Sequence, residues 1–158
     1  MKQLILIRHA KSSWKISDLE DSWRPLTARG YRQLSALIPH LPSTALWLVS
    51  PAVRTYTTAH VLRRMSGLPM TGLILDERLY ESSGHGLLTV LTSLGEEDKQ
   101  VLLVAHSPGL DELIGLLCPD ESLCITTSNL VSLELDVDRW AECRKGCGRV
   151  LQHLAPGV

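Results

Sequence analysis

Gln3-Leu4-Ile5-Leu6-Ile7-Arg8-His9 places an unbroken apolar run directly before an arginine and a histidine. A strand with one face in water would alternate polar and apolar residues, and this run does not. Uniformly apolar runs of this length are typical of strands in parallel sheets that helices cover on both faces. The stretch therefore predicts a central strand that carries chemically active side chains at its carboxyl end.

Three more runs of this kind follow along the chain, and stretches with helix signals separate them. The runs are rich in Leu, Ile and Val and cover residues 45–49, 72–75 and 101–105. N-cap and breaker residues between them predict helices over 28–38, 51–65, 84–94 and 108–117. Two short extended runs near the end, 129–136 and 149–154, can pair as an antiparallel edge.

This order of elements predicts an α/β fold. We expect a three-layer αβα sandwich with a mainly parallel central sheet and an antiparallel C-terminal edge. The length of 158 residues fits a single domain over 1–158. Lys and Arg total 16 against 17 for Asp and Glu, so the net charge is −1. Such a balance argues against nucleic-acid or membrane-surface partners.

The chain contains no apolar run near the ~20 residues that a membrane helix needs, and its first apolar run is too short for a signal peptide. We therefore expect a cytoplasmic protein. Its four cysteines are expected to be reduced rather than paired in that compartment.

Cationic and imidazole side chains follow three of the four apolar runs. The first run ends in Arg8-His9, the second is followed by Ser50-Pro51 with Arg54 one helical turn on, and the fourth ends before His106. Ligands of open α/β sheets bind outside the carboxyl ends of the strands, so we expect these side chains to share one crevice. Arginine forks match phosphoryl oxygens, and a neutral histidine can attack phosphorus. The set therefore predicts phosphoryl transfer and binding of phosphate or other oxyanions.

These residues also resemble a known family. Leu6-Ile7-Arg8-His9-Ala10 is similar to the Arg-His-Gly signature of the histidine phosphatase superfamily, which includes the phosphoglycerate mutases, and most similar to its SixA-type phosphohistidine phosphatases. Further matching segments follow in the same order: Arg24-Pro25-Leu26-Thr27 with Gly30, Ser50-Pro51 with Arg54 and Thr57-Thr58-Ala59, His106-Ser107-Pro108-Gly109-Leu110, Cys118-Pro119, and Thr126-Thr127-Ser128. Each motif is weak alone, but the ordered set is specific.

The resemblance implies a role for each matching residue. His9 is the expected nucleophile, Arg8 and Arg54 are expected to hold the phosphoryl oxygens, and His106 to stabilise the transferring group from the other side. The attacking nitrogen of His9 must be neutral, so its other ring nitrogen is expected to donate to a nearby carbonyl, and the neighbouring arginines favour the neutral ring. Two positions depart from the family pattern: Ala10 replaces the usual Gly, and Ser107 replaces a common Asn.

Other candidate residues have two interpretations each. Glu81 stands where the mutase-like branch has its acid, but it can equally be a solvated carboxylate at a helix start. Ser12 and Ser13 follow the signature and are candidate phosphate donors, or ordinary polar loop residues. Arg24 can line the pocket or position its loop, and we favour the structural role.

A second phosphatase motif is present near the C-terminus. Residues 143–149 fit C-x-x-x-x-x-R, the loop of cysteine-dependent phosphatases. A polar stretch precedes it and an extended one follows, so a glycine-rich hairpin turn explains it better. A zinc site at Cys143, Cys147 and His153 lacks a fourth ligand.

The leading hypothesis is a phosphohydrolase that needs no metal or cofactor, because arginines rather than carboxylate clusters gather at the strand ends. It is expected to act on phosphohistidine of a protein such as a phosphotransfer domain, since the chain between the third and fourth runs is too short to roof a small-molecule pocket. The alternatives are a small-molecule phosphomonoesterase and a non-catalytic phosphate-binding module.

Overall fold

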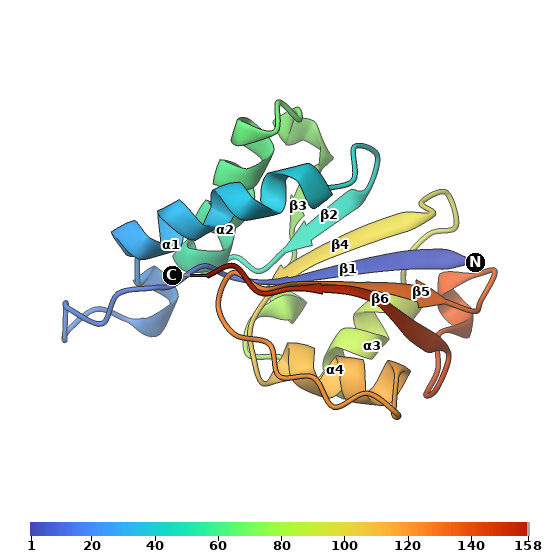
Figure 1. The fold of residues 1–158 in the computed structure, drawn as a ribbon. Helices are drawn as coiled ribbons and strands as arrows, with labels where there is room; N and C mark the ends of the chain where they lie inside the picture. The colour runs from blue at the N-terminus through green and yellow to red at the C-terminus, as the bar shows by residue number, and fades with distance from the viewer. Residues whose placement is uncertain (158) are drawn as a thin grey trace.

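A six-stranded sheet with helices on both faces forms the part of the chain that the computed structural model describes, residues 1–157. Helices α1 and α2 cover one face of the sheet, and α3 and α4 cover the other (Figure 1). The strands are β1 (Lys2–Arg8), β2 (Leu46–Val49), β3 (Leu73–Leu75), β4 (Gln100–Ala105), β5 (Leu130–Leu135) and β6 (Gly148–Leu154). The helices are α1 (Ala28–Leu34), α2 (Val53–Met65), α3 (Gly84–Thr92) and α4 (Gly109–Leu117). Short 3₁₀ turns are η1 (Asp21–Trp23), η2 (Ser35–His40), η3 (Met70–Gly72), η4 (Glu77–Leu79) and η5 (Trp140–Glu142).

The strand order β3-β2-β4-β1-β5-β6 confirms the predicted fold class. Strand β4 pairs in parallel with both β1 and β2, and β2 pairs in parallel with β3. Strand β5 runs antiparallel to β1, and β6 antiparallel to β5. The antiparallel edge is thus two strands wide. The predicted single domain also includes Val158, which lies outside the described residues.

The first strand is buried on both faces, as its uniform apolar sequence predicts. Leu4 and Leu6 pack into the core under α3 and α4, whereas Ile5 and Ile7 pack into the core under α1 and α2. Alternate residues of a strand point to opposite faces, so one short run supplies both cores. This fixes β1 in the centre of the sheet and its carboxyl end at the crevice.

The helices begin and end within a few residues of their predicted bounds, with two informative differences. The predicted helix over 28–38 is regular only as far as Leu34 and then tightens into η2, which contains Pro39. Proline lacks the N–H that a regular turn would use, and its ring crowds the preceding turn. Helix α2 starts at Val53 rather than at 51, because the extended backbone of Ala52 serves as its N-cap.

The cysteine motif lies in the hairpin turn that the sequence predicts. Gly146 has a φ of 81°, and strand β6 begins at Gly148, so no helix follows Cys143. All four cysteines are unpaired. No group of three His, Cys, Asp or Glu side chains within residues 1–157 is placed to hold a metal ion. None of the helices in this part of the chain is both long and apolar enough to cross a membrane.

We predict that Gly84→Ala destabilises the protein, because α3 begins against the backbone of α4. A Cβ at Gly84 would lie 2.6 Å from Cβ of Glu112 and 2.8 Å from its backbone carbonyl carbon. Overpacking of this kind costs about 1–3 kcal/mol. The matched control is Gly115→Ala in α4, which meets no atom within 4 Å and gains about 1 kcal/mol of helix propensity. Thermal unfolding should show a lower Tm for the first variant only; equal Tm values for Gly84→Ala and the unaltered protein would contradict this packing.

Candidate active site

The two strand-end histidines come together at one edge of the sheet. Strands β1 and β4 pair in register, with Arg8 opposite Ala105, so the residues that follow them leave adjacent strands side by side. The ring centroids of His9 and His106 are 5.4 Å apart. A cavity of about 180 Å³ lies against them. Its lining residues are Arg8, His9, Lys11, Ser12, Trp14, Arg24, Arg54, His106, Ser107 and Thr127. The predicted convergence of Arg8, His9, Arg54 and His106 is therefore confirmed.

His9 is held in one orientation by its own backbone neighbourhood. Its Nδ1 lies 2.8 Å from the carbonyl oxygen of Ala10, and because a carbonyl only accepts, Nδ1 carries the proton and donates. The lone pair is left on Nε2. Burial lowers the pKa of His9 to about 4, the bond to Ala10 opposes this shift, and the charges of Arg54 and Arg8 add to the lowering. The ring is therefore neutral at pH 7, and burial contributes more to this than the arginines that the sequence pointed to.

The loop after β1 is fixed by contacts that also reach α2. The backbone N–H of Ala10 donates to Thr58 Oγ1 at 3.0 Å, and that hydroxyl donates to the carbonyl oxygen of Arg54 at 2.7 Å. Ala10 is fully buried. Its methyl group is accommodated next to Gly30, where a Cβ would lie 3.3 Å from that of Ala10 and 2.6 Å from the carbonyl oxygen of Lys11. The departure from the family glycine at position 10 is thus absorbed by a glycine on α1.

His106 is oriented by Ser50, which follows strand β2. Oγ of Ser50 lies 2.7 Å from Nε2 of His106. Burial lowers the pKa of His106 to about 3, and the nearby charge of Arg54 lowers it further, so this ring is also neutral at pH 7. When the Ser50 hydroxyl donates, the ring proton resides on Nδ1. That atom is buried and has no hydrogen-bond partner among residues 1–157, so its donor is unused within this part of the chain.

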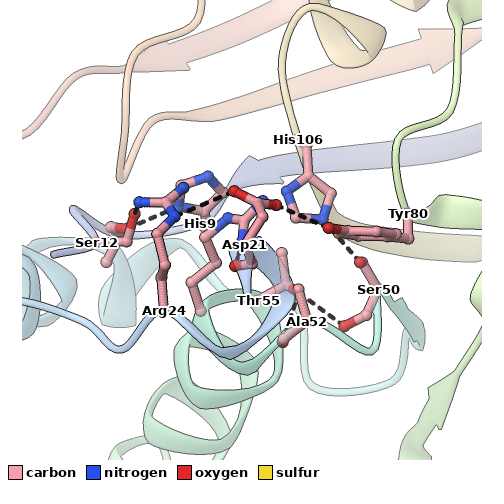
Figure 2. A network of polar contacts seen from close by, with 11 residues as sticks. His9, Ser12, Asp21, Arg24, Ser50, Ala52, Thr55, Tyr80 and His106 are labelled. Atoms are coloured by element: carbon pink, nitrogen blue, oxygen red, sulfur yellow. Dashed lines mark hydrogen bonds and ion pairs between the residues drawn. The ribbon is translucent and has the colours of Figure 1, made fainter. Parts of the chain in front are cut away.

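Asp21 links the arginines of the site, and no sequence pattern pointed to it. Figure 2 shows its carboxylate between Arg24 and Tyr80. Arg54 donates to the carbonyl oxygen of Asp21 at 2.7 Å and to Oδ2 at 2.8 Å. Arg24 Nε donates to Oδ1 at 3.1 Å, and the Tyr80 hydroxyl donates to Oδ2 at 2.8 Å. Burial alone would raise the pKa of Asp21, but the hydrogen bonds from Tyr80 and Arg54 outweigh it and lower the pKa to about 2.

Arg24 both lines the cavity and supports it. Its NH1 donates to Ser12 Oγ at 2.7 Å, and its guanidinium lies 3.5 Å from the centre of the Trp14 ring. Arg8 is anchored in a similar way, since its NH1 donates to the carbonyl oxygen of Ile125 at 2.9 Å. Arg24 therefore positions its loop, which is the role that the sequence favoured, and it also lines the cavity.

The remaining candidates lie at different distances from this cavity. Ser12 lines it, but Ser13 does not, because the Ser13 hydroxyl accepts from the backbone N–H of Lys15 at 3.1 Å. Glu81 lies in the left-handed region with a φ of 53° and lines an adjoining cavity of about 460 Å³, which also contacts Arg54 and His106. Glu81 thus remains a candidate acid at the edge of the site.

Comparison with known proteins gives one consistent result. The family described as "Histidine phosphatase superfamily (branch 1)" matches residues 4–92. The chain is 30% identical over 141 residues to the phosphohistidine phosphatase SixA of Escherichia coli K12, with 85% of this chain and 86% of that protein covered.

Solved structures agree with this result at the level of fold. A structure assigned as SixA from Nakamurella multipartitia has a TM-score of 0.82 at 22% identity, covering 99% of this chain and 97% of that one. The protein histidine phosphatase SixA complexed with tungstate has a TM-score of 0.80 at 24% identity, covering 98% of this chain and 97% of that one. A mycobacterial glucosyl-3-phosphoglycerate phosphatase follows at 0.67 and 17%, covering 95% of this chain and 97% of that one.

The lowered pKa of His9 can be measured directly. At pH 5.5 a histidine with the ordinary pKa of 6.5 is about 90% protonated, whereas one with a pKa of 4 is about 3% protonated. We expect ¹⁵N ring shifts of His9, assigned by comparison with His9→Gln, to stay those of a neutral Nδ1–H ring at pH 5.5. Between pH 6.5 and 4 the unfolded chain binds a proton at His9 and the folded protein does not. The free energy of unfolding therefore decreases as the pH is lowered from 6.5 to 4. A titration midpoint near 6.5 would contradict the buried site.

Proposed function

The chain belongs to the histidine phosphatase superfamily, and on this basis we propose that it is a phosphohistidine phosphatase that acts on proteins through a covalent phosphoryl group on His9. The SixA relative is named for this activity. We further propose that it is a single-domain enzyme of the cytoplasm. The four unpaired cysteines support this location, because thiols stay reduced there.

The observation that carries the proposal is the state of His9. It is a buried imidazole, only 6% exposed, whose pKa of about 4 keeps it neutral and whose Nδ1–H is tied to Ala10. Such a ring has its Nε2 lone pair available at neutral pH. A structural histidine has no need of a second neutral histidine 5.4 Å away and three arginines around the same cavity.

The proposed reaction has two displacements at phosphorus. Nε2 of His9 forms a bond to the phosphorus atom while the P–N bond to the substrate imidazole breaks. The other nitrogen of the substrate ring carries a proton, so that imidazole keeps the bonding pair and leaves as a neutral ring. Water then attacks phosphorus, the bond to Nε2 breaks with its electron pair returning to His9, and the protons of the water leave with inorganic phosphate. His106 Nδ1–H, lying across the cavity, donates to the phosphoryl oxygens as their charge shifts.

Arg8 and Arg54 have donors suited to the phosphoryl oxygens. The Nε atom of each is buried and has no hydrogen-bond partner within residues 1–157. Buried unpaired donors are rare in folded proteins, and an oxyanion between these two would satisfy both. At ~4 Å each pair of unit charges contributes about 4 kcal/mol at an effective dielectric near 20. Ser12 Oγ already accepts a hydrogen bond from Arg24. We therefore propose that Ser12 acts on the phosphate indirectly, by positioning Arg24.

We also propose that catalysis needs no metal or cofactor. The cavity presents arginines, a lysine and neutral imidazoles, whereas Mg²⁺ and Mn²⁺ prefer clusters of carboxylates. The carboxylate of Asp21 is already occupied by donors from Arg54, Arg24 and Tyr80.

Dependence on Glu81 distinguishes a phosphohistidine phosphatase from a phosphomonoesterase. An alkoxide leaving group needs a proton. Glu81 is exposed and borders the adjoining cavity, so we assign it as the carboxyl group that would supply this proton. A phosphohistidine ring that is protonated on its other nitrogen releases a neutral imidazole and needs no proton from Glu81. The two functions therefore differ in whether they depend on Glu81.

The proposed substrate class is tested by comparing kcat/KM in excess EDTA for a phosphohistidine-bearing phosphotransfer protein and for sugar phosphates. We expect the protein to be preferred by at least about a hundredfold, that is about 2.7 kcal/mol of transition-state binding. A preference for sugar phosphates would establish the phosphomonoesterase instead. Absence of turnover on every substrate would indicate a phosphate-binding module, and activity restored only by a divalent metal would refute metal independence.

The proposed nucleophile is tested by labelling with a radioactive phosphohistidine donor and quenching in alkaline detergent, because the expected adduct does not survive acid. The unaltered enzyme should form an adduct that is stable in base and labile in acid, and His9→Ala should form none and lose turnover. Cys143→Ser is the control, since Cys143 lies in the hairpin turn and its pKa is raised by a hydrogen bond to Cys147 and by burial. Labelling that survives in His9→Ala but not in Cys143→Ser would reverse the assignment.

A further inference from the structure

The turn η1 exposes a tryptophan next to the site. Trp23 is 62% exposed, and η1 buries none of its three residues. The segment between β1 and α1 that contains η1 projects from the body of the molecule (Figure 1). Its position is set by polar contacts of Asp21 with Arg54, Arg24 and Tyr80, not by packing of the indole. The exposed ring is therefore not explained by the stability of the loop.

The indole borders a hollow of about 260 Å³. The lining residues are all uncharged: Ser22, Trp23, Pro51, Ala52, Val53 and Tyr80. The hollow thus lies between η1, the turn that leads into α2, and the residue that follows η4. Its chemistry differs from that of the neighbouring cavity at His9, which is lined by arginines and polar groups. A hollow of this composition favours an apolar side chain.

The hollow adjoins the catalytic cavity through two of its own residues. Tyr80 lines the hollow, donates to Asp21, and has its ring 5.5 Å from that of His106. Val53 lines the hollow, and the next residue, Arg54, lines the cavity. A group that fills the hollow therefore lies beside the reacting phosphoryl group and outside the polar cavity.

We propose that this hollow and the indole of Trp23 form a docking site for an apolar side chain on the protein that carries the phosphohistidine. The inference rests on the proposed function. A phosphohistidine projects from the surface of its protein, so when phosphorus lies against His9, the surrounding surface of that protein must lie against the rim, where η1 projects. The uncharged lining selects an apolar neighbour of the phosphohistidine.

Tryptophan suits this role physically. Its large ring supplies contact area while ordering only two side-chain torsions, and tryptophan is enriched among residues that dominate binding energy. Trp14, on the same loop and 70% exposed, borders the catalytic cavity itself under Arg24. The two indoles thus border different spaces, since Trp14 lines the catalytic cavity and Trp23 lines the uncharged hollow.

The test compares a protein substrate with a small donor that has the same P–N bond. Trp23→Ala should lower kcat/KM on a phosphohistidine-bearing phosphotransfer protein about tenfold or more, through KM, because truncation at a binding hot spot costs at least that much. It should change kcat/KM on phosphoramidate less than about twofold. Trp23→Phe, which keeps part of the ring area, should lose less on the protein. The control is Tyr31→Ala, an aromatic on α1 that is 46% exposed and outside the hollow, and it should change neither rate.

Each other outcome overturns the docking site. Equal losses on both substrates would mean that Trp23 supports the loop and Asp21, and unchanged rates on both would mean that no partner uses the hollow. A loss confined to sugar phosphates would make a small molecule the occupant. Failure of the proposed function looks different: the unaltered enzyme would itself turn over neither the phosphohistidine protein nor phosphoramidate, and the docking proposal would fall with it.

Discussion

The parallel pairing of β1 with β4 is the constraint on which the site depends. Arg8 stands opposite Ala105, and the N–H of His9 donates to the carbonyl oxygen of Ala105 at 3.3 Å. This register delivers two imidazoles to the same edge of the sheet, one from each strand end. A slip of one residue would turn every side chain of β1 to the opposite face and would move Ile5 and Ile7 out of their core. The two packed cores therefore fix where the strand ends lie, and the contacts of His9 with Ala10 and of His106 with Ser50 then orient the two rings.

The second constraint is electrostatic. Arg8, Arg24 and Arg54 crowd around a cavity that must accept a dianion, and without one their charges repel. Asp21 offsets part of this charge, and its pKa of about 2 keeps it ionised across the neutral range. The same surroundings keep His9 and His106 uncharged, because burial next to the arginines lowers their pKa values as well. A phosphoryl group that binds here must share Arg54 with Asp21, whose oxygens already accept from both terminal nitrogens of that guanidinium.

Sequence patterns predicted the regular elements and the residues at their ends. They did not predict loop residues whose partners lie far along the chain. Apolar runs predicted the four parallel strands, and two short extended runs predicted the antiparallel pair. The strand ends predicted His9 and His106, because a parallel sheet brings such ends together. Asp21 was invisible for the opposite reason: it lies in a polar loop, 33 residues from Arg54 and 59 from Tyr80, and nothing near it marks a partner. The same limit applied to Ser13, whose hydroxyl turns back to Lys15 rather than to the cavity. Spacing finds residues on regular elements, whereas loop residues are placed by contacts that only the fold creates.

One loop connects recognition to chemistry. The three residues of η1 turn Asp21 toward the arginines and leave the Trp23 indole in solvent. The Tyr80 hydroxyl holds Asp21 from the other side while the same residue lines the apolar hollow. A protein that presses on Trp23 therefore presses on the turn that positions Arg54. The proposed docking residue Trp23 and the carboxylate that accepts from Arg54 thus lie two residues apart on one turn. A small phosphorylated molecule that does not reach η1 leaves that turn held only by its own hydrogen bonds.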